Sequence, residues 1–260
     1  MKIWLNGAIL DADSACISPT DRGFTLGDGV FETMQARNGA PLRLDAHLAR
    51  LRRGAGLIGL PLPRLDYAGA LLATLEANGL RDAALRLTLS RGPAPRGVLP
   101  PAEPTPTVLI SAGPLPDLTP VRLVLAKVTR RNEFSPLSGI KSLNYLDSIL
   151  ARQEAAARGA DDALMLNTQG RIAETTMANV FLVLNGNLVT PPLSDGALPG
   201  IMRAEVLKAG AVEQAILPAD IARAREIFIT TSLGIRSVDE VEGRPLGDFT
   251  IAARMRAAIG

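Results

Sequence analysis

Residues 139–146 read Gly139-Ile140-Lys141-Ser142-Leu143-Asn144-Tyr145-Leu146 and place a lysine between an apolar approach and an amphipathic segment. That segment, Ser142 to Arg158, predicts a helix packed on a core. Its apolar side chains at helical spacing are Leu143, Leu146, Ile149, Leu150 and Ala157. Lys141 would then stand at the entrance of the helix. A capping or surface lysine is the ordinary interpretation, so its surroundings must decide whether it has a chemical task.

Composition limits the class of protein to which this chain can belong. The chain has 260 residues, 47% of them hydrophobic, which is enough for a substantial core and for two modest domains. The formal net charge is only +2, and basic and acidic residues are interspersed, so nucleic acid is a poor candidate partner. A single cysteine, Cys16, excludes an intrachain disulfide and a cysteine-based metal cluster, and no metal site is expected.

No membrane partner is expected either. The start of the chain meets polar residues too early for a secretory signal, and no apolar run is long enough to cross a bilayer. We therefore expect a soluble cytoplasmic protein.

The first part of the chain predicts a small α/β domain of residues 1–116. The expected elements are helices at about 45–59 and 65–78 and strands at 84–90 and 107–112. Between the two strands, Arg91 to Pro101 is too rich in Pro and Gly for a helix or a strand, and it predicts a long functional loop. The glycine-rich segment Asp21 to Thr33 indicates strand-like and turn-like pieces, and its glycines lack the spacing of a dinucleotide fingerprint.

Residues 117–260 predict a second, larger domain. The proline-rich stretch Gly113-Pro114-Leu115-Pro116-Asp117 is typical of a connector because it separates two blocks of alternating apolar residues. Asn185-Gly186 is the strongest hairpin-turn signal in the chain, and a helix is expected to begin at Gly200. Further expected elements are strands at 121–128, 163–166, 171–174 and 226–230 and a helix at about 218–225.

Four features indicate chemistry only when they are taken together. Lys141 can form an imine, and Glu174 can hold a charge-assisted hydrogen bond. The stretch Leu198-Pro199-Gly200-Ile201-Met202 places a glycine at a helix start, where backbone N–H groups attract phosphate. Arg50 and the hydroxyl of Ser232 could complete the anion site. Pyridoxal 5′-phosphate (PLP) requires an amine, a carboxylate and a phosphate-binding site.

Each member of this set also has an ordinary alternative. Arg50 alone is typical of a solvated helix residue, Glu174 of an exposed strand end, and Gly200 of an N-cap. His47, the only histidine, is a candidate general base. We rank it below a structural role, because Lys141 can perform the proton transfers and His47 has no paired acid in the sequence.

The order of these motifs resembles that of a known family. The chain resembles the class IV aminotransferases, the PLP-dependent fold type IV family that includes branched-chain and D-amino-acid aminotransferases and aminodeoxychorismate lyase. The motifs that carry the resemblance span nearly the whole chain: Asp21-Arg22-Gly23, Gly27 to Glu32, His47 to Leu51, Ser90-Arg91-Gly92, Arg96-Gly97, Lys141 with Asn144 to Leu146, Glu174, Ala178 to Phe181, Leu198 to Arg203, and Glu226 to Thr230.

The resemblance implies a mixed α/β fold of two domains, residues 1–116 and 117–260, with PLP in the interdomain cleft and bound mainly by the larger domain. It implies that Lys141 forms the Schiff base and that Glu174 contacts the pyridine nitrogen. The residues implied to hold the phosphate are Arg50, the backbone amides of Ile201 and Met202, and Ser232. Tyr145 would reach the phenolic oxygen of the cofactor, although its spacing from the lysine is one residue shorter than in the branched-chain enzymes.

The resemblance is divided between two activities. Tyr145 to Leu150 and the Leu198 to Ile201 turn are similar to the aminotransferases, and we favour a transaminase that acts on an amino donor and a 2-keto acid. Thr33, in contrast, resembles a threonine that is a proposed proton carrier in aminodeoxychorismate lyase, which releases 4-aminobenzoate and pyruvate. A strand residue without a catalytic task is the ordinary interpretation of Thr33.

Substrate contacts are implied for Phe31, Arg96, Val98 and Leu233. Arg96 matches the arginine with which D-amino-acid aminotransferases bind the substrate carboxylate, but Phe31 and Val98 replace the tyrosine and the histidine of that site. A carboxylate site without these two donors should bind differently or more weakly, and the apolar replacements favour a hydrophobic amino acid or an amine.

The family also implies a homodimer, in which a loop from one subunit completes the active site of the other. A PLP-binding or structural protein without turnover is a further alternative. The combination of an imine lysine, a ring carboxylate and a substrate loop argues against it.

Overall fold

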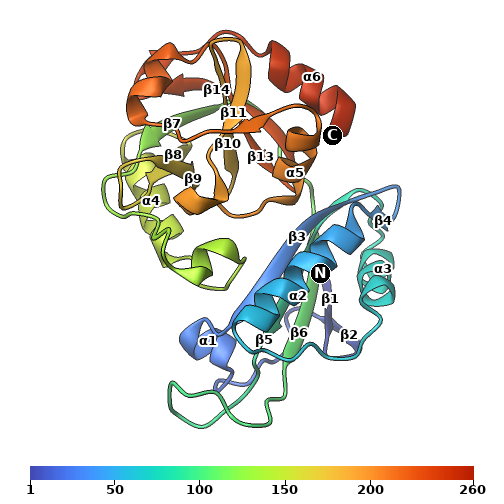
Figure 1. The fold of residues 1–260 in the computed structure, drawn as a ribbon. Helices are drawn as coiled ribbons and strands as arrows, with labels where there is room; N and C mark the ends of the chain where they lie inside the picture. Colours follow the sequence, from blue (N-terminus) through green and yellow to red (C-terminus); the bar gives the residue numbers. More distant parts are fainter. The chain divides into compact units, whose positions relative to one another are not determined.

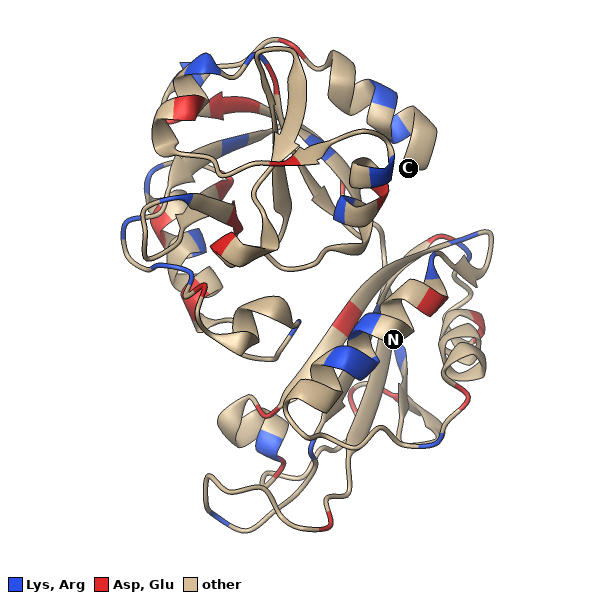
Figure 2. Ribbon diagram, in the orientation of Figure 1, with Lys and Arg blue, Asp and Glu red and all other residues tan.

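The computed structural model describes all 260 residues, and they form two compact units. Unit 1 consists of Met1–Pro116 together with Ile140–Asn144, and unit 2 consists of Asp117–Gly139 and Tyr145–Gly260. The sequence analysis placed the short Ile140–Asn144 segment in the second domain, whereas in the structure it packs with unit 1. Positive and negative side chains are interspersed in both units (Figure 2).

Unit 1 is built on a six-stranded sheet (Figure 1). The strands pair in the order β2-β1-β6-β5-β3-β4, and every pairing is antiparallel. Their bounds are β1 Lys2–Leu5, β2 Ala8–Asp11, β3 Gly29–Arg37, β4 Ala40–Pro41, β5 Ala83–Ser90 and β6 Thr107–Gly113. The predicted strands at 84–90 and 107–112 are therefore confirmed as β5 and β6.

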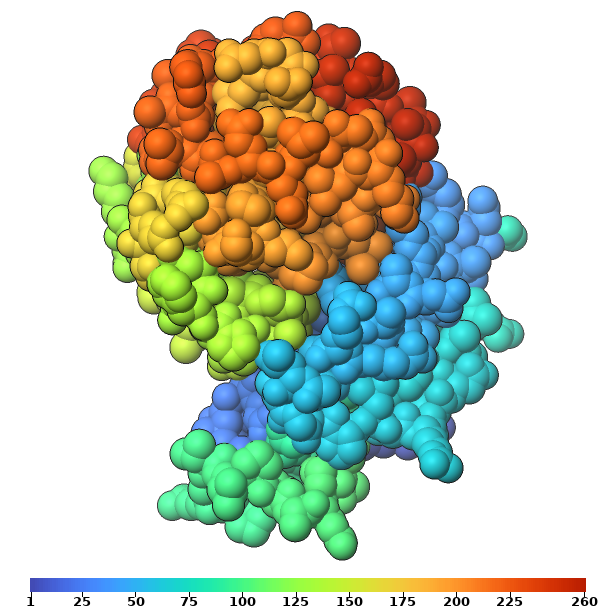
Figure 3. Space-filling model, viewed as in Figure 1, coloured from blue at the N-terminus to red at the C-terminus, as the bar shows by residue number.

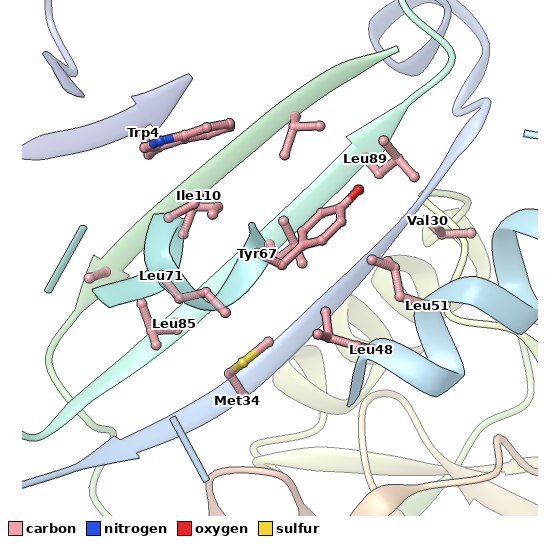
Figure 4. Close-up of a cluster of buried hydrophobic side chains, with 14 of the residues drawn as sticks. Trp4, Val30, Met34, Leu48, Leu51, Tyr67, Leu71, Leu85, Leu89 and Ile110 are labelled. Atoms are coloured by element: carbon pink, nitrogen blue, oxygen red, sulfur yellow. The ribbon is translucent and has the colours of Figure 1, made fainter. Parts of the chain in front are cut away.

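Helices pack on this sheet through apolar side chains. They are α2 Leu44–Leu57 and α3 Tyr67–Ala77, whereas the short helix α1 Arg22–Leu26 buries only Arg22. On α2, Leu48, Leu51 and Ala55 recur every three or four residues and are buried, so they form the stripe that faces the core. Figure 4 shows Leu48 and Leu51 near Val30 and Met34 of β3, with Tyr67 and Leu71 of α3 in the same cluster.

Within unit 1, the prediction agrees least well with the structure in the glycine-rich segment Asp21 to Thr33. The glycine-rich residues were read as alternating strand-like and turn-like pieces, yet they form α1 and the first part of the nine-residue strand β3. Gly29 is the first residue of β3, where a Cβ atom would come within 2.4 Å of the carbonyl oxygen of Leu89. The glycine thus reflects a close approach between neighbouring strands.

Unit 2 is built on a nine-stranded mixed sheet. Eight strands follow the order β12-β11-β10-β13-β14-β7-β8-β9, and β15 pairs with β14 outside this path. β7 is parallel to both of its neighbours, β14 and β8. The bounds are β7 Val121–Leu125, β8 Asp162–Leu166, β9 Ile172–Thr175, β10 Asn179–Leu184, β11 Asn187–Thr190, β12 Val212–Glu213, β13 Ile227–Thr231, β14 Gly234–Val241 and β15 Arg244–Pro245.

The helices of unit 2 agree less well with the sequence. They are α4 Leu146–Ala157, α5 Ile201–Lys208 and α6 Thr250–Ile259, with 3-10 turns η1 Pro136–Gly139, η2 Leu193–Asp195 and η3 Pro218–Arg223. The helix expected at about 218–225 is the 3-10 turn η3, and β14 and α6 were not predicted. The Asn185-Gly186 hairpin between β10 and β11 is confirmed. None of the helices combines the length and the apolar character that crossing a membrane requires.

Helix α4 departs from its prediction at both its start and its buried face. It begins at Leu146, four residues after the expected start. Ala151 and Ala155 are fully buried, whereas Leu146, Ile149 and Leu150 are 75%, 48% and 45% exposed. Alanines four residues apart lie on one face, and their small side chains suit close packing against β8, so the larger apolar residues point outward.

Candidate active site

Lys141 lies in an extended segment of unit 1. Its carbonyl oxygen accepts a hydrogen bond from the N–H of Phe31 at 2.9 Å, and Leu143 N–H donates to the Gly29 carbonyl at 3.0 Å. The segment is therefore added to the start of β3 in the manner of a short strand. The expectation that Lys141 stands at a helix entrance is wrong, because the backbone of residues 141–143 is used in pairing with β3.

The side chain of Lys141 shares an aromatic ring with an arginine. Its Nζ lies 4.4 Å from the centroid of the Phe31 ring, and the guanidinium carbon of Arg86 lies 3.7 Å from the same centroid. Phe31 is buried, with 4% exposed. We call Phe31, Arg86 and Lys141 the Phe31 cluster. Two cations on one ring are held there by its quadrupole, and this places a guanidinium near a primary amine.

Arg86 was missed by the sequence analysis. It lies on β5, and in the strand register it is opposite Thr33, two residues beyond Phe31 on β3. Since alternate residues of a strand share a face, Thr33 and Phe31 lie on the same face of the sheet. The available signal was that Arg86 is the one charged residue of the strand Ala83–Ser90.

Arg50 is buried, contrary to its ordinary interpretation as a solvated residue. Its Nε and Nη2 donate to Oε1 and Oε2 of Glu32 at 2.8 and 2.6 Å, and Nδ1 of His47 lies 2.7 Å from Oε2. Burial by itself would raise the pKa of Glu32, but the hydrogen bonds from Arg50 and His47 outweigh it and hold this pKa below its ordinary value. The guanidinium of Arg50 is therefore fixed in place by an ionised carboxylate.

The two substrate residues expected on the loop point to solvent in unit 1. Arg96 and Val98 follow β5, and Val98 is 84% exposed. Figure 3 shows the part of the chain near residue 100 at the lower edge of the surface, projecting from unit 1. The loop expected between the two strands is present, and its side chains are not buried beside Phe31.

In unit 2, Glu174 is a buried carboxylate with a donor on each oxygen. Nη2 of Arg131 lies 3.1 Å from Oε1, and the N–H of Leu198 donates to Oε2 at 2.9 Å. Arg131 also donates to the carbonyls of Gly196 and Ser138. Glu174 is only 8% exposed, so the alternative of an exposed strand end is excluded. Arg131, the cation paired with Glu174, was not identified from the sequence.

The start of α5 leaves its backbone N–H groups open to a bound anion. Gly200 is the N-cap and supplies no side chain, so the first N–H groups of the helix, including those of Ile201 and Met202, have no side-chain cap. A Cβ atom at Gly200 would meet Oδ1 of Asn179 at 2.0 Å. Nδ2 of Asn179 holds the turn by donating to the Leu198 carbonyl at 2.9 Å. Such a helix start attracts an anion.

Ser232 and Leu233 form the turn between β13 and β14, where both are half-buried. Asn179 is opposite Thr230 in the register of β10 and β13, so this turn and the start of α5 lie at the same end of the sheet. Unit 2 therefore brings together Glu174, the α5 amides and Ser232. Tyr145 is the N-cap of α4 and is also half-buried.

Known proteins match this chain over most of its length. The model of the family Amino-transferase class IV matches residues 29–241. A putative branched-chain-amino-acid aminotransferase of Methanocaldococcus jannaschii is 37% identical, and the match covers 95% of this chain and 90% of that protein.

Solved structures agree with the sequence matches. A branched-chain amino acid aminotransferase from T.th., solved with pyridoxamine 5′-phosphate, matches with a TM-score of 0.90 and 26% identity, covering 99% of this chain and 92% of that chain. A 4-amino-4-deoxychorismate lyase from Pseudomonas aeruginosa matches with a TM-score of 0.85 and 34% identity, covering 99% and 97%. The mixed α/β fold that the resemblance implied is confirmed.

Proposed function

This chain belongs to the class IV aminotransferase family, and from that premise we propose that it is a PLP-dependent transaminase. It would transfer an amino group between an amino acid or amine and a 2-keto acid. The observation that carries the proposal is the Phe31 cluster, in which Lys141 and Arg86 lie over one ring. A guanidinium near the reactive amine suits the carboxylate of an amino acid.

The residues of unit 2 fit the cofactor at two of its ends. Glu174, paired with Arg131, would accept a hydrogen bond from the pyridine nitrogen. The amides of Ile201 and Met202, together with Ser232, would bind the phosphate at the uncapped start of α5. We assign Tyr145 to the phenolic oxygen and Arg50 of unit 1 to the phosphate. When bound, PLP supplies an electron sink for the carbanion at the substrate Cα.

The residues of unit 1 would perform the proton chemistry. Lys141 would hold the cofactor covalently. Once the substrate amine frees it, Lys141 would take the proton from Cα as a base and give it up as an acid at the imine carbon of the cofactor. Arg86 would orient the substrate carboxylate, and apolar Phe31 would exclude water from the reacting atoms. With Val98 and Leu233 as further contacts, these residues suit a hydrophobic amino donor.

Aminodeoxychorismate lyase is the second candidate, and a specific observation favours it. Thr33 lies on the same face of β3 as Phe31 and opposite Arg86 in the strand register, which supports a role for it beside the Phe31 cluster. A threonine there suits a proton carrier for a leaving aromatic amine. The 34% identity to the Pseudomonas aeruginosa lyase supports the same alternative.

One experiment separates the two activities. The purified enzyme is given aminodeoxychorismate alone and, separately, pyruvate or 2-oxoglutarate with a panel of L-, D- and achiral amino donors. A transaminase consumes the keto acid and forms a new amino acid, whereas a lyase releases aminobenzoate without an acceptor. Aminobenzoate as the only product would overturn our first choice. Hydride reduction should label Lys141 in either case, and a label elsewhere would contradict both assignments.

We also propose that the enzyme is a homodimer. Unit 1 exposes several large apolar side chains on α1 and on the loop after β5: Phe24 is 80% exposed, Leu26 47%, Val98 84% and Leu99 87%. Apolar surface of this kind is typical of a contact with another chain. Light scattering during size-exclusion chromatography should give twice the 27.4 kDa mass of one chain, and a monomeric mass would contradict the proposal.

A further inference from the structure

Arg22, Asp28 and Arg91 meet at one carboxylate oxygen in unit 1. The Nε atoms of Arg22 and Arg91 both donate to Oδ2 of Asp28, at 2.8 and 2.7 Å. The two arginine side chains are only 5% and 3% exposed. The proposed chemistry assigns no task to any of these three residues. Buried pairs of this kind are hard to open, because opening one strands a charge away from water.

Arg22 holds the middle of the loop that carries the expected substrate residues. Its Nη1 and Nη2 donate to the carbonyl oxygens of Gly97 and Val98, both at 2.8 Å. These carbonyls belong to two successive peptide groups, and Arg96 immediately precedes Gly97. The planar guanidinium therefore fixes the direction of two successive carbonyls, which a lysine ammonium could not do.

Arg91 makes the matching contacts on the other side. Its Nη1 and Nη2 donate to the carbonyl oxygens of Gly59 and Ile58 at 2.8 and 2.7 Å. These residues follow the C-terminal end of α2, the helix that carries Arg50. One oxygen of Asp28 thus ties the loop after β5 to the end of α2.

The base of the loop is fixed as well. Oδ2 of Asp21 accepts hydrogen bonds from the hydroxyls of Ser90 and Thr107, which lie at the ends of β5 and β6, at 2.9 and 2.7 Å. Gly92 has a φ of +82°, and a Cβ atom there would come within 1.8 Å of the Thr105 carbonyl oxygen. The backbone of the loop is therefore constrained at its base and at Gly97, although residues 95–100 are exposed and this part of the chain projects at the surface (Figure 3).

We propose that Arg22, Asp28 and Arg91 form a latch that holds the Arg91–Pro101 loop in the shape that receives substrate, with Arg22 as a positioning residue for Arg96 and Val98. The inference rests on the proposed function for the substrate role of the loop. Fixing the backbone before binding removes the ordering cost that a mobile loop would pay when substrate arrives. The latch is thus a determinant of substrate affinity.

The charges of the latch persist at neutral pH. Burial by itself would raise the pKa of Asp28, but hydrogen bonds from Arg91 and Arg22 outweigh it and hold this pKa below its ordinary value. At neutral pH, Asp28 therefore remains an anion that both arginines can share.

The test compares Arg22→Lys with Arg53→Lys in the PLP-loaded enzyme. Arg53 is an exposed residue of α2, so it controls for the same chemical change at the surface. In Arg22→Lys, amide hydrogen exchange at Ala94, Arg96, Gly97 and Val98 should speed up about tenfold. KM for the amino donor should rise about tenfold, while kcat and PLP affinity change less than about twofold. Arg53→Lys should match the wild type throughout.

Asp28→Asn provides an independent variant that keeps the shape of the side chain. It should speed exchange both in the loop and at Ile58 and Gly59, because both arginines lose their shared anion. Unchanged loop exchange in Arg22→Lys and Asp28→Asn overturns the latch. Faster exchange with an unchanged KM overturns its substrate role. A wild-type enzyme without transaminase turnover would instead overturn the proposed function, since exchange is measured without substrate.

Discussion

Arg50 and Glu32 form a two-point ion pair inside unit 1, with Nε to Oε1 at 2.8 Å and Nη2 to Oε2 at 2.6 Å. Both side chains are almost fully buried, at 4% and 0% exposed. The same carboxylate faces Nδ1 of His47 at 2.7 Å, so the expectation that this histidine has no paired acid is wrong. His47 is buried and shares Glu32 with Arg50, which is compatible with the structural role. The pair ties β3, which carries Phe31, to α2, so a residue proposed to bind phosphate is positioned by the core.

Glu32→Gln should destabilise the protein strongly. The variant keeps the size of the side chain but leaves the Arg50 charge buried without its anion, and removing one partner of a buried pair costs about 3–5 kcal/mol in the free energy of unfolding. Urea denaturation of the wild type and the variant measures the loss. Glu76→Gln, at an exposed position of α3, should change stability by less than about 0.5 kcal/mol. Equal stabilities of the two variants would contradict the assignment.

The same pair predicts how stability depends on pH. Because the folded protein holds the pKa of Glu32 below the ordinary value of 4.5, the unfolded chain takes up a proton first as pH falls. The stabilisation is therefore fully present above pH 4.5 and is lost as pH falls through the lower pKa of the folded state. Urea denaturation from pH 7 to 4 should show the wild type approaching Glu32→Gln below pH 4.5. A constant difference would show that Glu32 does not titrate in this way.

The sequence predicts elements whose signals are local. The Asn185-Gly186 turn, helices α2 and α3, and strands β5 and β6 each carry their signal within a few residues, and the structure contains them. Strand β3 was obscured because Gly29 is required by the carbonyl of Leu89, which comes from a neighbouring strand. In α4, the buried face was misjudged because small alanines allow a close approach that hydrophobicity alone does not indicate.

The candidate site shows the same division. Lys141, Glu174 and Gly200 were identified from their local sequence and from the family resemblance. Arg86 and Arg131 were not identified, because their roles depend on contacts with residues distant in the chain. Arg86 contacts the Phe31 ring, and Arg131 contacts the Glu174 carboxylate. A single sequence gives no measure of which such pairs will meet.

Arg131→Lys should weaken PLP binding about tenfold. The lysine keeps the positive charge, but its ammonium group lacks the planar set of N–H donors that contacts Glu174 and the two carbonyls at once. The loss of a charge-assisted hydrogen bond costs about 1.5–3 kcal/mol. Absorbance titration of the apoenzyme with PLP measures the affinity. Arg130→Lys is the matched control, because Arg130 binds only backbone carbonyls in the contacts described. The proposed role of Arg131 fails if the two variants bind PLP equally well.

Gly200→Ala should reduce the affinity for the phosphate group. A Cβ atom would lie 2.0 Å from Oδ1 of Asn179, so either the start of α5 or the Asn179 side chain must move. Movement of this turn displaces the amides of Ile201 and Met202, and we expect at least a tenfold loss of PLP affinity, equivalent to about 1.4 kcal/mol.

Pyridoxal without its phosphate provides the internal comparison, since its binding does not use the helix start. In Gly200→Ala, the affinity for PLP should therefore fall more than the affinity for pyridoxal. Gly247→Ala is the control in the same unit, because a Cβ atom there meets nothing within 4 Å. If Gly200→Ala lowers the affinities for pyridoxal and for PLP by the same factor, the substitution damages the fold in general and the start of α5 is not the phosphate site.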